Sequence, residues 1–175
     1  MQAVLNLIWD KLLPAMNPGP LPAYDESHKK LETRLAHLTL PAQEGSSSPS
    51  TFPSKKYVFP ANDRKLEAIS LEQAEQSGAV TLVTRVDGVE TRVPCASGTW
   101  TSARMAQLPA LPEQPVATSG GWTAGDTFKV KLCFYETPFI VTLSLKFEGD
   151  QLLLDTQSNV GFGQNRRPRL TGTGG

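Results

Sequence analysis

Alternation of large apolar residues with mostly polar ones within residues 127–162 constrains the fold of this chain more than any other feature. The apolar members of two successive runs are Phe128, Val130, Leu132 and Phe134, then Val141, Leu143, Leu145 and Phe147. Because successive side chains of a β-strand point to opposite faces, each run predicts a strand with one dry and one wet face. The sequence therefore indicates a β-structure in this region.

Two-residue turns fix the register of two predicted hairpins. With Gly149-Asp150 as the first turn, dry residues face each other in the pairs Phe147–Leu152, Leu145–Leu154 and Leu143–Thr156. A slip by one residue would destroy this match. The second hairpin joins residues 79–86 to residues 89–95 around Asp87-Gly88. Its expected pairs are Val86–Val89, Thr84–Thr91, Leu82–Val93 and Val80–Cys95 on one face and Arg85–Glu90 on the other.

Shorter segments complete the predicted sheet. Strands are expected at residues 57–59, 66–71, 97–100, 116–122 and 169–172. Residues 101–114 are expected to form a loop, because they are weakly patterned and contain Pro109 and Pro112. Together with the two hairpins this makes about 8–10 antiparallel strands, which close into a barrel or a curled sandwich.

Two short helices are expected before the strands. Residues 2–13 carry a wide apolar stripe at three- and four-residue spacing, made of Val4, Leu5, Ile8, Trp9, Leu12 and Leu13. Asp25 is the expected N-cap of a second helix that runs to about Leu38. The expected organisation is a helical segment at 1–40, a flexible linker at 41–54, a β-barrel at 55–172 and a tail at 173–175.

Charge and hydropathy argue against several function classes. The formal net charge is zero and the sequence pI is about 6.7, so no basic field favours nucleic acid or an anionic membrane surface. We expect no membrane span, because no run of about 18 apolar residues occurs, and the N-terminus does not resemble a signal peptide. Cys95 and Cys133 fall on opposite strand faces, so two free thiols are expected.

The sequence offers no convincing catalytic, metal or cofactor site. Ser27 to Lys30 fits a Ser-x-x-Lys nucleophile pattern, but chance alone gives about 0.7 such matches in a chain of this composition. His28 and His37 lie nine residues apart and so on opposite faces of one helix. We therefore expect no catalytic residue, no metal, no cofactor and no enzymatic activity in this chain.

Three local features suggest binding surfaces. Tyr135, Glu136 and Phe139 surround a tight corner, which could be the mouth of a ligand-holding barrel, a docking edge, or simply a hairpin loop capped by aromatic residues. Arg166 and Arg167 could bind an acidic partner, although a solvated loop is the simpler interpretation. The helix that carries Trp9 and Leu12 has more apolar surface than a short isolated helix needs, so it is expected to dock on something.

Residues 131–163, followed by residues 167–172, resemble the C-terminal domain of bacterial serine hydrolases related to class C β-lactamases and penicillin-binding proteins. The matching stretches read KLCFYETPFIVTLSLKFEGDQLLLDTQSNVGFG and RPRLTG. Residues 9–16 also look like the segment by which these hydrolases leave their catalytic domain, and residues 119–122 resemble the strand before the central hairpins. The resemblance implies a lipocalin-like accessory barrel. The catalytic motifs of that family belong to its N-terminal domain, so no catalytic residue is carried over to this chain.

The resemblance leads to one hypothesis and the barrel alone to another. The first is a non-catalytic accessory domain that packs on the serine hydrolase domain of the same parent chain, in a periplasmic or secreted enzyme. The second is a free-standing lipocalin-like module that binds a small apolar ligand. The candidate ligand or interface residues are Trp9, Leu12, Trp122, Tyr135, Glu136 and Phe139.

Overall fold

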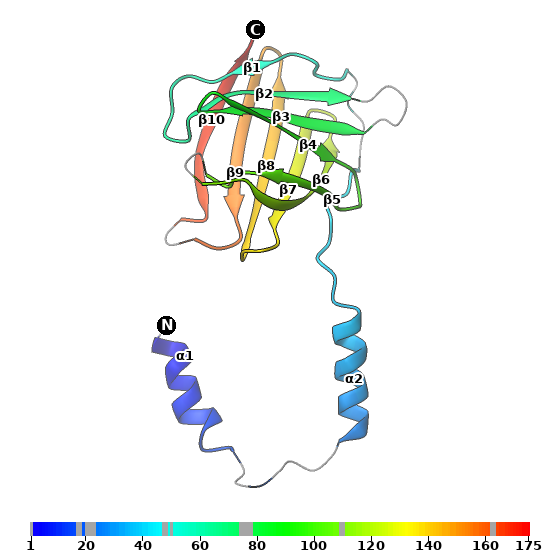
Figure 1. The fold of residues 1–175 in the computed structure, drawn as a ribbon, viewed down its shortest axis with the longest axis vertical. Coiled ribbons are helices and arrows are strands. Elements are labelled where there is room, and N and C mark those ends of the chain that lie inside the picture. Colours follow the sequence, from blue (N-terminus) through cyan, green and yellow to red (C-terminus); the bar gives the residue numbers. More distant parts are fainter. Residues whose placement is uncertain are drawn as a thin grey trace. The chain divides into compact units, whose positions relative to one another are not determined.

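The chain consists of a helical unit and a β-sheet unit. The computed structural model describes residues 2–16, 19, 24–46, 49, 51–73, 79–108, 111–161 and 164–175. These residues fall into two compact units, Met1–Leu40 and Pro41–Gly175. The first unit contains both helices and the second contains all the strands, as Figure 1 shows.

The first unit consists of two short helices, as predicted. The α-helix α1 (Gln2–Leu7) continues directly into a π-helical turn, η1 (Ile8–Leu12), which the backbone N–H of Leu13 closes by donating to the carbonyl of Ile8. The helix α2 spans Asp25–Ala36, so Asp25 is its first residue rather than its N-cap, and Tyr24 occupies the cap position. None of the residues of α1, η1 and α2, all of which the structure describes, is buried.

The second unit is an antiparallel sheet that curls into a nearly closed barrel (Figure 1), which confirms the predicted fold class. Its strands are β1 (Tyr57–Val58), β2 (Leu66–Gln73), β3 (Val80–Val86), β4 (Val89–Cys95), β5 (Thr101–Met105), β6 (Gln114–Ala124), β7 (Thr127–Phe134), β8 (Phe139–Glu148), β9 (Gln151–Ser158) and β10 (Arg166–Gly174). Their order is β4-β3-β2-β1-β10-β9-β8-β7-β6-β5. Every sequential strand from β1 to β4 and from β5 to β10 pairs with the next, and β1 also pairs with β10.

The registers predicted for both hairpins are confirmed. In β8 and β9, Leu145 pairs with Leu154 and the flanking pairs follow as expected. In β3 and β4, Arg85 lies opposite Glu90. However, the Arg85 side chain forms its ion pair with Glu67 of β2, at 2.8 Å between Nε and Oε2. The apolar residues therefore predicted the pairing of β3 with β4 correctly, but Arg85 of β3 forms its ion pair with β2, the strand on the opposite side of β3.

The prediction for residues 97–114 is wrong in two respects. Residues 97–99 form a turn and a bend rather than a strand, and Gly98 there has a left-handed backbone with φ of 71°. The strand β5 instead occupies Thr101–Met105, within the predicted loop, and pairs with β6. Alternate residues of β5 point inward, as in any strand. The inward side chains are those of Thr101, Ala103 and Met105, which are small, polar or flexible, so the sequence shows only a weak alternation of apolar and polar residues.

The residues 43–46, which we call the strap, cover the edge of β6 beyond the part that pairs with β5. The strap lies inside the segment that the sequence indicated as a flexible linker. The Ser46 N–H donates to the carbonyl of Trp122 at 2.8 Å, and the Gly45 N–H donates to Ser97 Oγ at 2.7 Å. The Gln43 N–H donates to Ser119 Oγ at 2.9 Å. The bond from Ser46 gives a partner to a backbone carbonyl at the edge of β6, and the other two bonds fasten the strap to serine side chains.

Candidate functional site: a cavity at one end of the barrel

One end of the barrel interior is filled by aromatic side chains. The Trp122 ring lies 5.1 Å from the ring of Phe128 and 5.8 Å from that of Phe147, measured between centroids. The Tyr57 ring lies 5.4 Å from the Phe147 ring, and Phe52 packs edge-on against Trp122 at 6.3 Å. This aromatic cluster lies toward the Gly149-Asp150 turn, and ring pairs in such tilted arrangements stabilise a core beyond their buried area.

The opposite end of the barrel contains a cavity of about 440 Å³. It is bordered by the turn between β3 and β4 and by described residues of the loop between β5 and β6. Its apolar wall consists of Leu66, Ile69, Val86, Val89, Met105, Ala106, Leu108, Leu111, Leu132, Phe134, Val141, Leu143 and Leu154. Three of these residues remain exposed at the rim, namely Val89, Leu108 and Leu111.

The length of the inward side chains explains why one end is filled and the other is hollow. Along β8 the inward positions are Val141, Leu143, Leu145 and Phe147. Leu145 is completely buried, whereas Val141 and Leu143 are only half-buried because they border the cavity. A ten-stranded barrel is wide, and aliphatic side chains do not meet across it as the aromatic rings do at the other end.

A β-bulge in β10 places Arg167 and Arg169, which are two positions apart, on opposite sides of the sheet. Arg167 pairs with Thr156 and Leu170 with Leu154, so the two residues between them, Pro168 and Arg169, face the single residue Asp155 of β9. Pro168 has no N–H to contribute to the ladder, which suits it to a bulge. The bulge places Arg167 on the cavity wall and Arg169 outside.

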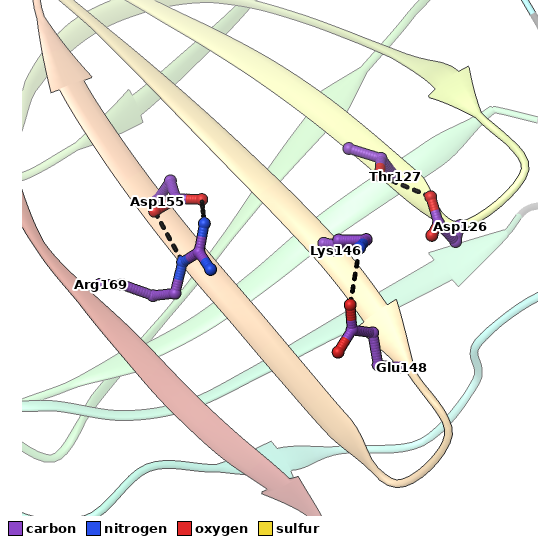
Figure 2. Close-up of polar contacts among 6 residues, drawn as sticks. All are labelled: Asp126, Thr127, Lys146, Glu148, Asp155 and Arg169. Carbon is purple, nitrogen blue, oxygen red and sulfur yellow. Dashed lines mark hydrogen bonds and ion pairs between the residues drawn. The ribbon is translucent and has the colours of Figure 1, made fainter.

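Arg169 forms a bidentate ion pair on the outer face of the barrel (Figure 2). Its Nε and Nη2 atoms donate to the two oxygens of Asp155 at 2.9 and 2.8 Å. This pair lowers the pKa of Asp155, first through the hydrogen bond from Arg169. Lys146 and Glu148 form a second outer pair at 2.6 Å, also drawn in Figure 2. These four charged side chains therefore pair with one another on the outer face of the barrel.

Arg64 lies on the cavity wall and is held from two sides. The Asn62 side chain accepts hydrogen bonds from the backbone N–H groups of Arg64 and Leu66, which orders the loop between β1 and β2. The Arg64 Nη1 donates to Thr156 Oγ1 at 3.1 Å, and Nη2 donates to the carbonyl of Pro168 in the bulge. The bulge therefore fixes the guanidinium beside the cavity.

The Arg64 guanidinium is incompletely satisfied. Its Nε is buried and has no hydrogen-bond partner among the described residues, and an orphaned buried donor of this kind costs about 1–3 kcal/mol. Burial lowers the pKa of Arg64, and the positive charge of Arg167 lowers it further, while Asp63 raises it. The group nevertheless stays charged at neutral pH, because an arginine begins from a very high value.

The residues singled out from the sequence lie in three separate places. Trp122 is buried in the aromatic cluster at the filled end. Tyr135, Glu136 and Phe139 surround the turn between β7 and β8 at the cavity end, where Tyr135 and Glu136 are exposed and Phe139 is half-buried against the core. In the described part of the chain the cavity wall includes their neighbour Phe134 but none of these three.

The remaining candidates belong to the helical unit or carry little chemistry. Trp9 and Leu12 are 65% and 57% exposed. His28 lies 3.2 Å from Glu32 on α2, and the described residues contain no group of three or more side chains able to hold a metal ion. Within those same residues, no helix is both long enough and apolar enough to cross a membrane.

Sequence reasoning missed Arg64 as a cavity residue. A lone arginine after Asn62-Asp63 in a polar loop gives no signal of burial. Arg167 was one of two arginines considered, but the pattern did not separate it from Arg166, which pairs with Gln157 and does not border the cavity among the described residues. Only the register of β10 distinguishes the two.

Comparisons with known proteins add no assignment. No protein-family model matches this sequence, and no curated protein matches it.

Proposed function

We propose that the β-barrel of this chain is a binding module for a small, mainly apolar ligand. The observation that supports the proposal is the cavity of about 440 Å³ with its aliphatic wall. Ligand sites in proteins are typically concave and mostly apolar, with volumes of roughly 300–1,000 Å³. An apolar ligand would bury the half-exposed side chains of Val141 and Leu143, and each Å² of apolar surface removed from water contributes about 25 cal/mol.

A neutral fluorescent probe tests this function directly. N-phenylnaphthylamine fluoresces strongly in apolar surroundings, so titration of the purified full chain should give a saturable increase in emission. The variant Leu143→Trp fills the cavity from β8 and should abolish this increase. Leu153→Trp is the matched control, because Leu153 lies on the outward face of β9, where it pairs with Lys146, and it should leave binding unchanged.

Two results would contradict the proposal. One is the absence of saturable emission with the unmodified chain. The other is equal emission from Leu143→Trp and the unmodified chain, which would place the probe elsewhere. Circular dichroism of each variant distinguishes loss of the cavity from loss of the fold.

A second candidate function is that of a non-catalytic accessory domain of a periplasmic or secreted serine hydrolase, as the sequence resemblance implies. A specific observation favours it. Most apolar side chains of α1 and η1, including Trp9 and Leu12, are exposed on a short helix, where partner surface would be needed to cover them. The catalytic domain of the same parent chain is the partner we propose for this face.

An immunoblot of source-cell fractions tests this second candidate. An accessory domain should appear as a band much larger than 19.0 kDa in the periplasmic or secreted fraction. A band near 19.0 kDa would contradict the candidate and favour a free-standing binding module. In addition, this chain should change the stability or substrate range of the isolated catalytic domain at micromolar concentration.

A further inference from the structure

We propose that the ligand of the cavity is an amphipathic anion of the fatty-acid class, with its tail against the aliphatic wall and its carboxylate beside Arg64 and Arg167. This inference rests on the proposed binding function and names the chemical class that the site would accept. It follows from the charges on the wall rather than from the cavity volume.

The two arginines lie on the same part of the wall. Thr156 connects them, because it pairs with Arg167 in the sheet and accepts a hydrogen bond from Arg64 Nη1 at 3.1 Å. Neither arginine forms an ion pair with a carboxylate among the described residues, unlike Arg85, Arg92 and Arg169. They are close enough that the charge of Arg167 disfavours the charge of Arg64. An anion placed between them would relieve this repulsion.

The acidic residues on the cavity border do not neutralise this pair. Asp87 is already paired with Lys65, at 2.7 Å between Oδ2 and Nζ. Asp63 is exposed, and its effect on Arg64 is smaller than that of Arg167. Glu113 belongs to the other side of the barrel, where the loop after β5 leads into β6. The positive groups are therefore gathered on the β9–β10 wall.

The Arg64 side chain is also pre-organised for such a head group. The carbonyl of Pro168 in the bulge and the hydroxyl of Thr156 hold two of its nitrogens, so little rotamer freedom remains to be lost when an anion binds. Guanidinium groups favour carboxylates because several donors lie in one plane. Arg64 and the aliphatic side chains line the same cavity, so we expect an anion with an apolar tail to bind better than inorganic phosphate.

Displacement of N-phenylnaphthylamine by three ligands with the same tail tests the head group. Decanoate, decanol and decylamine differ only in being anionic, neutral and cationic. We expect decanoate to compete at least tenfold more strongly than decanol, which corresponds to about 1.4 kcal/mol, and decylamine to compete more weakly than decanol. The preference for decanoate should decrease as salt increases, because part of it arises from exposed charge.

Single substitutions test whether Arg64 and Arg167 cause the preference for decanoate over decanol. Arg64→Gln should weaken decanoate competition by about tenfold and leave decanol unaffected. Arg167→Gln should weaken decanoate by about threefold or more, since this residue is exposed and partly screened. Arg166→Gln removes the same charge one position away, off the cavity wall, and is the matched control that should change nothing. If Arg64→Gln does not fold, the comparison of Arg167→Gln with Arg166→Gln decides the question.

The outcomes separate this inference from the function on which it rests. If the unmodified chain binds neither N-phenylnaphthylamine nor decanol, the cavity does not bind apolar ligands and both proposals fail. If decanol competes as well as decanoate, the binding function stands and the anionic class is wrong. If Arg167→Gln and Arg166→Gln weaken competition by decanoate equally, the proposal that the arginines on the cavity wall bind the carboxylate is also wrong.

Discussion

Replacing Gly121 by alanine should release the strap without unfolding the barrel. Gly121 lies in β6 directly beneath residues 44 and 45, where a Cβ atom would lie 2.6 Å from the backbone nitrogen of Gly45 and 2.8 Å from the carbonyl carbon of Glu44. Real Cβ contacts are not this short, and backbone atoms cannot rotate away as the end of a side chain can. The strap must therefore move away from β6.

The energetic cost of this release is small because two contributions nearly cancel. The strap loses the hydrogen bonds made by the N–H groups of Gln43, Gly45 and Ser46, the bond from the Gly98 N–H to the Gln43 carbonyl, and the bond from Ser46 Oγ to the Thr123 carbonyl, each worth about 0.5–1.5 kcal/mol net. It regains the backbone freedom of residues 43–46, worth about 1–2 kcal/mol per residue. We expect Gly121→Ala to change the free energy of unfolding by no more than about 1 kcal/mol.

The neighbouring glycine provides the contrast. Gly120 faces the interior, where a Cβ atom would lie 2.8 Å from Cys95 Cβ and 2.9 Å from Phe128 Cζ. Both neighbours are buried, so the barrel itself must distort. Overpacking of this kind typically costs about 1–3 kcal/mol. Two adjacent Gly→Ala changes should therefore act on different parts of the molecule.

Hydrogen exchange and urea unfolding distinguish the two variants. In Gly121→Ala, amide exchange across residues 43–46 should accelerate by about tenfold or more, while the urea midpoint stays nearly constant. In Gly120→Ala the midpoint should fall clearly. Ser97→Ala, which removes the acceptor of the Gly45 N–H, should cost nothing further in the Gly121→Ala background. Unchanged exchange of the strap in Gly121→Ala, or a midpoint as low as that of Gly120→Ala, would refute the reasoning.

Three further predictions concern the core, the outer ion pair and the thiols. Leu145→Ala should destabilise the barrel by about 2–5 kcal/mol in urea unfolding, because Leu145 is completely buried. Asp155→Asn should lower the melting temperature slightly at pH 7 and by progressively less as the pH falls below the ordinary pKa of an aspartate. The reason is that Arg169 lowers the pKa of Asp155 in the folded state, so the stabilisation exists above the unfolded pKa and disappears as the pH falls through the folded one. At pH 8, iodoacetamide should modify Cys133 well before Cys95, as followed by mass spectrometry, because burial raises the pKa of Cys95 to about 12.

The sequence predicted those parts of the fold that local patterns determine. The hairpins around Asp87-Gly88 and Gly149-Asp150 were predicted residue by residue, because strong alternation and a two-residue turn leave one register that matches dry faces. The strand β5 was missed because its pattern depends on Ala103 and Met105 rather than on large β-branched residues. Its pairing with β6 is a tertiary contact that no local signal announces.

The cavity could not be predicted, because it depends on what faces a residue across the barrel. Val141, Leu143 and Leu145 have the same parity and the same aliphatic character, and all read as core positions. Only Leu145 is fully buried, because it lies nearer the aromatic cluster, whereas Val141 and Leu143 border the cavity. The position of Arg167 on the cavity wall could not be predicted either, because it depends on a local irregularity of β10. The bulge at Pro168 sends Arg167 inward and Arg169 outward, although simple alternation would place both on one face. A one-residue irregularity thus decides which cation faces the cavity and which pairs with Asp155 in solvent.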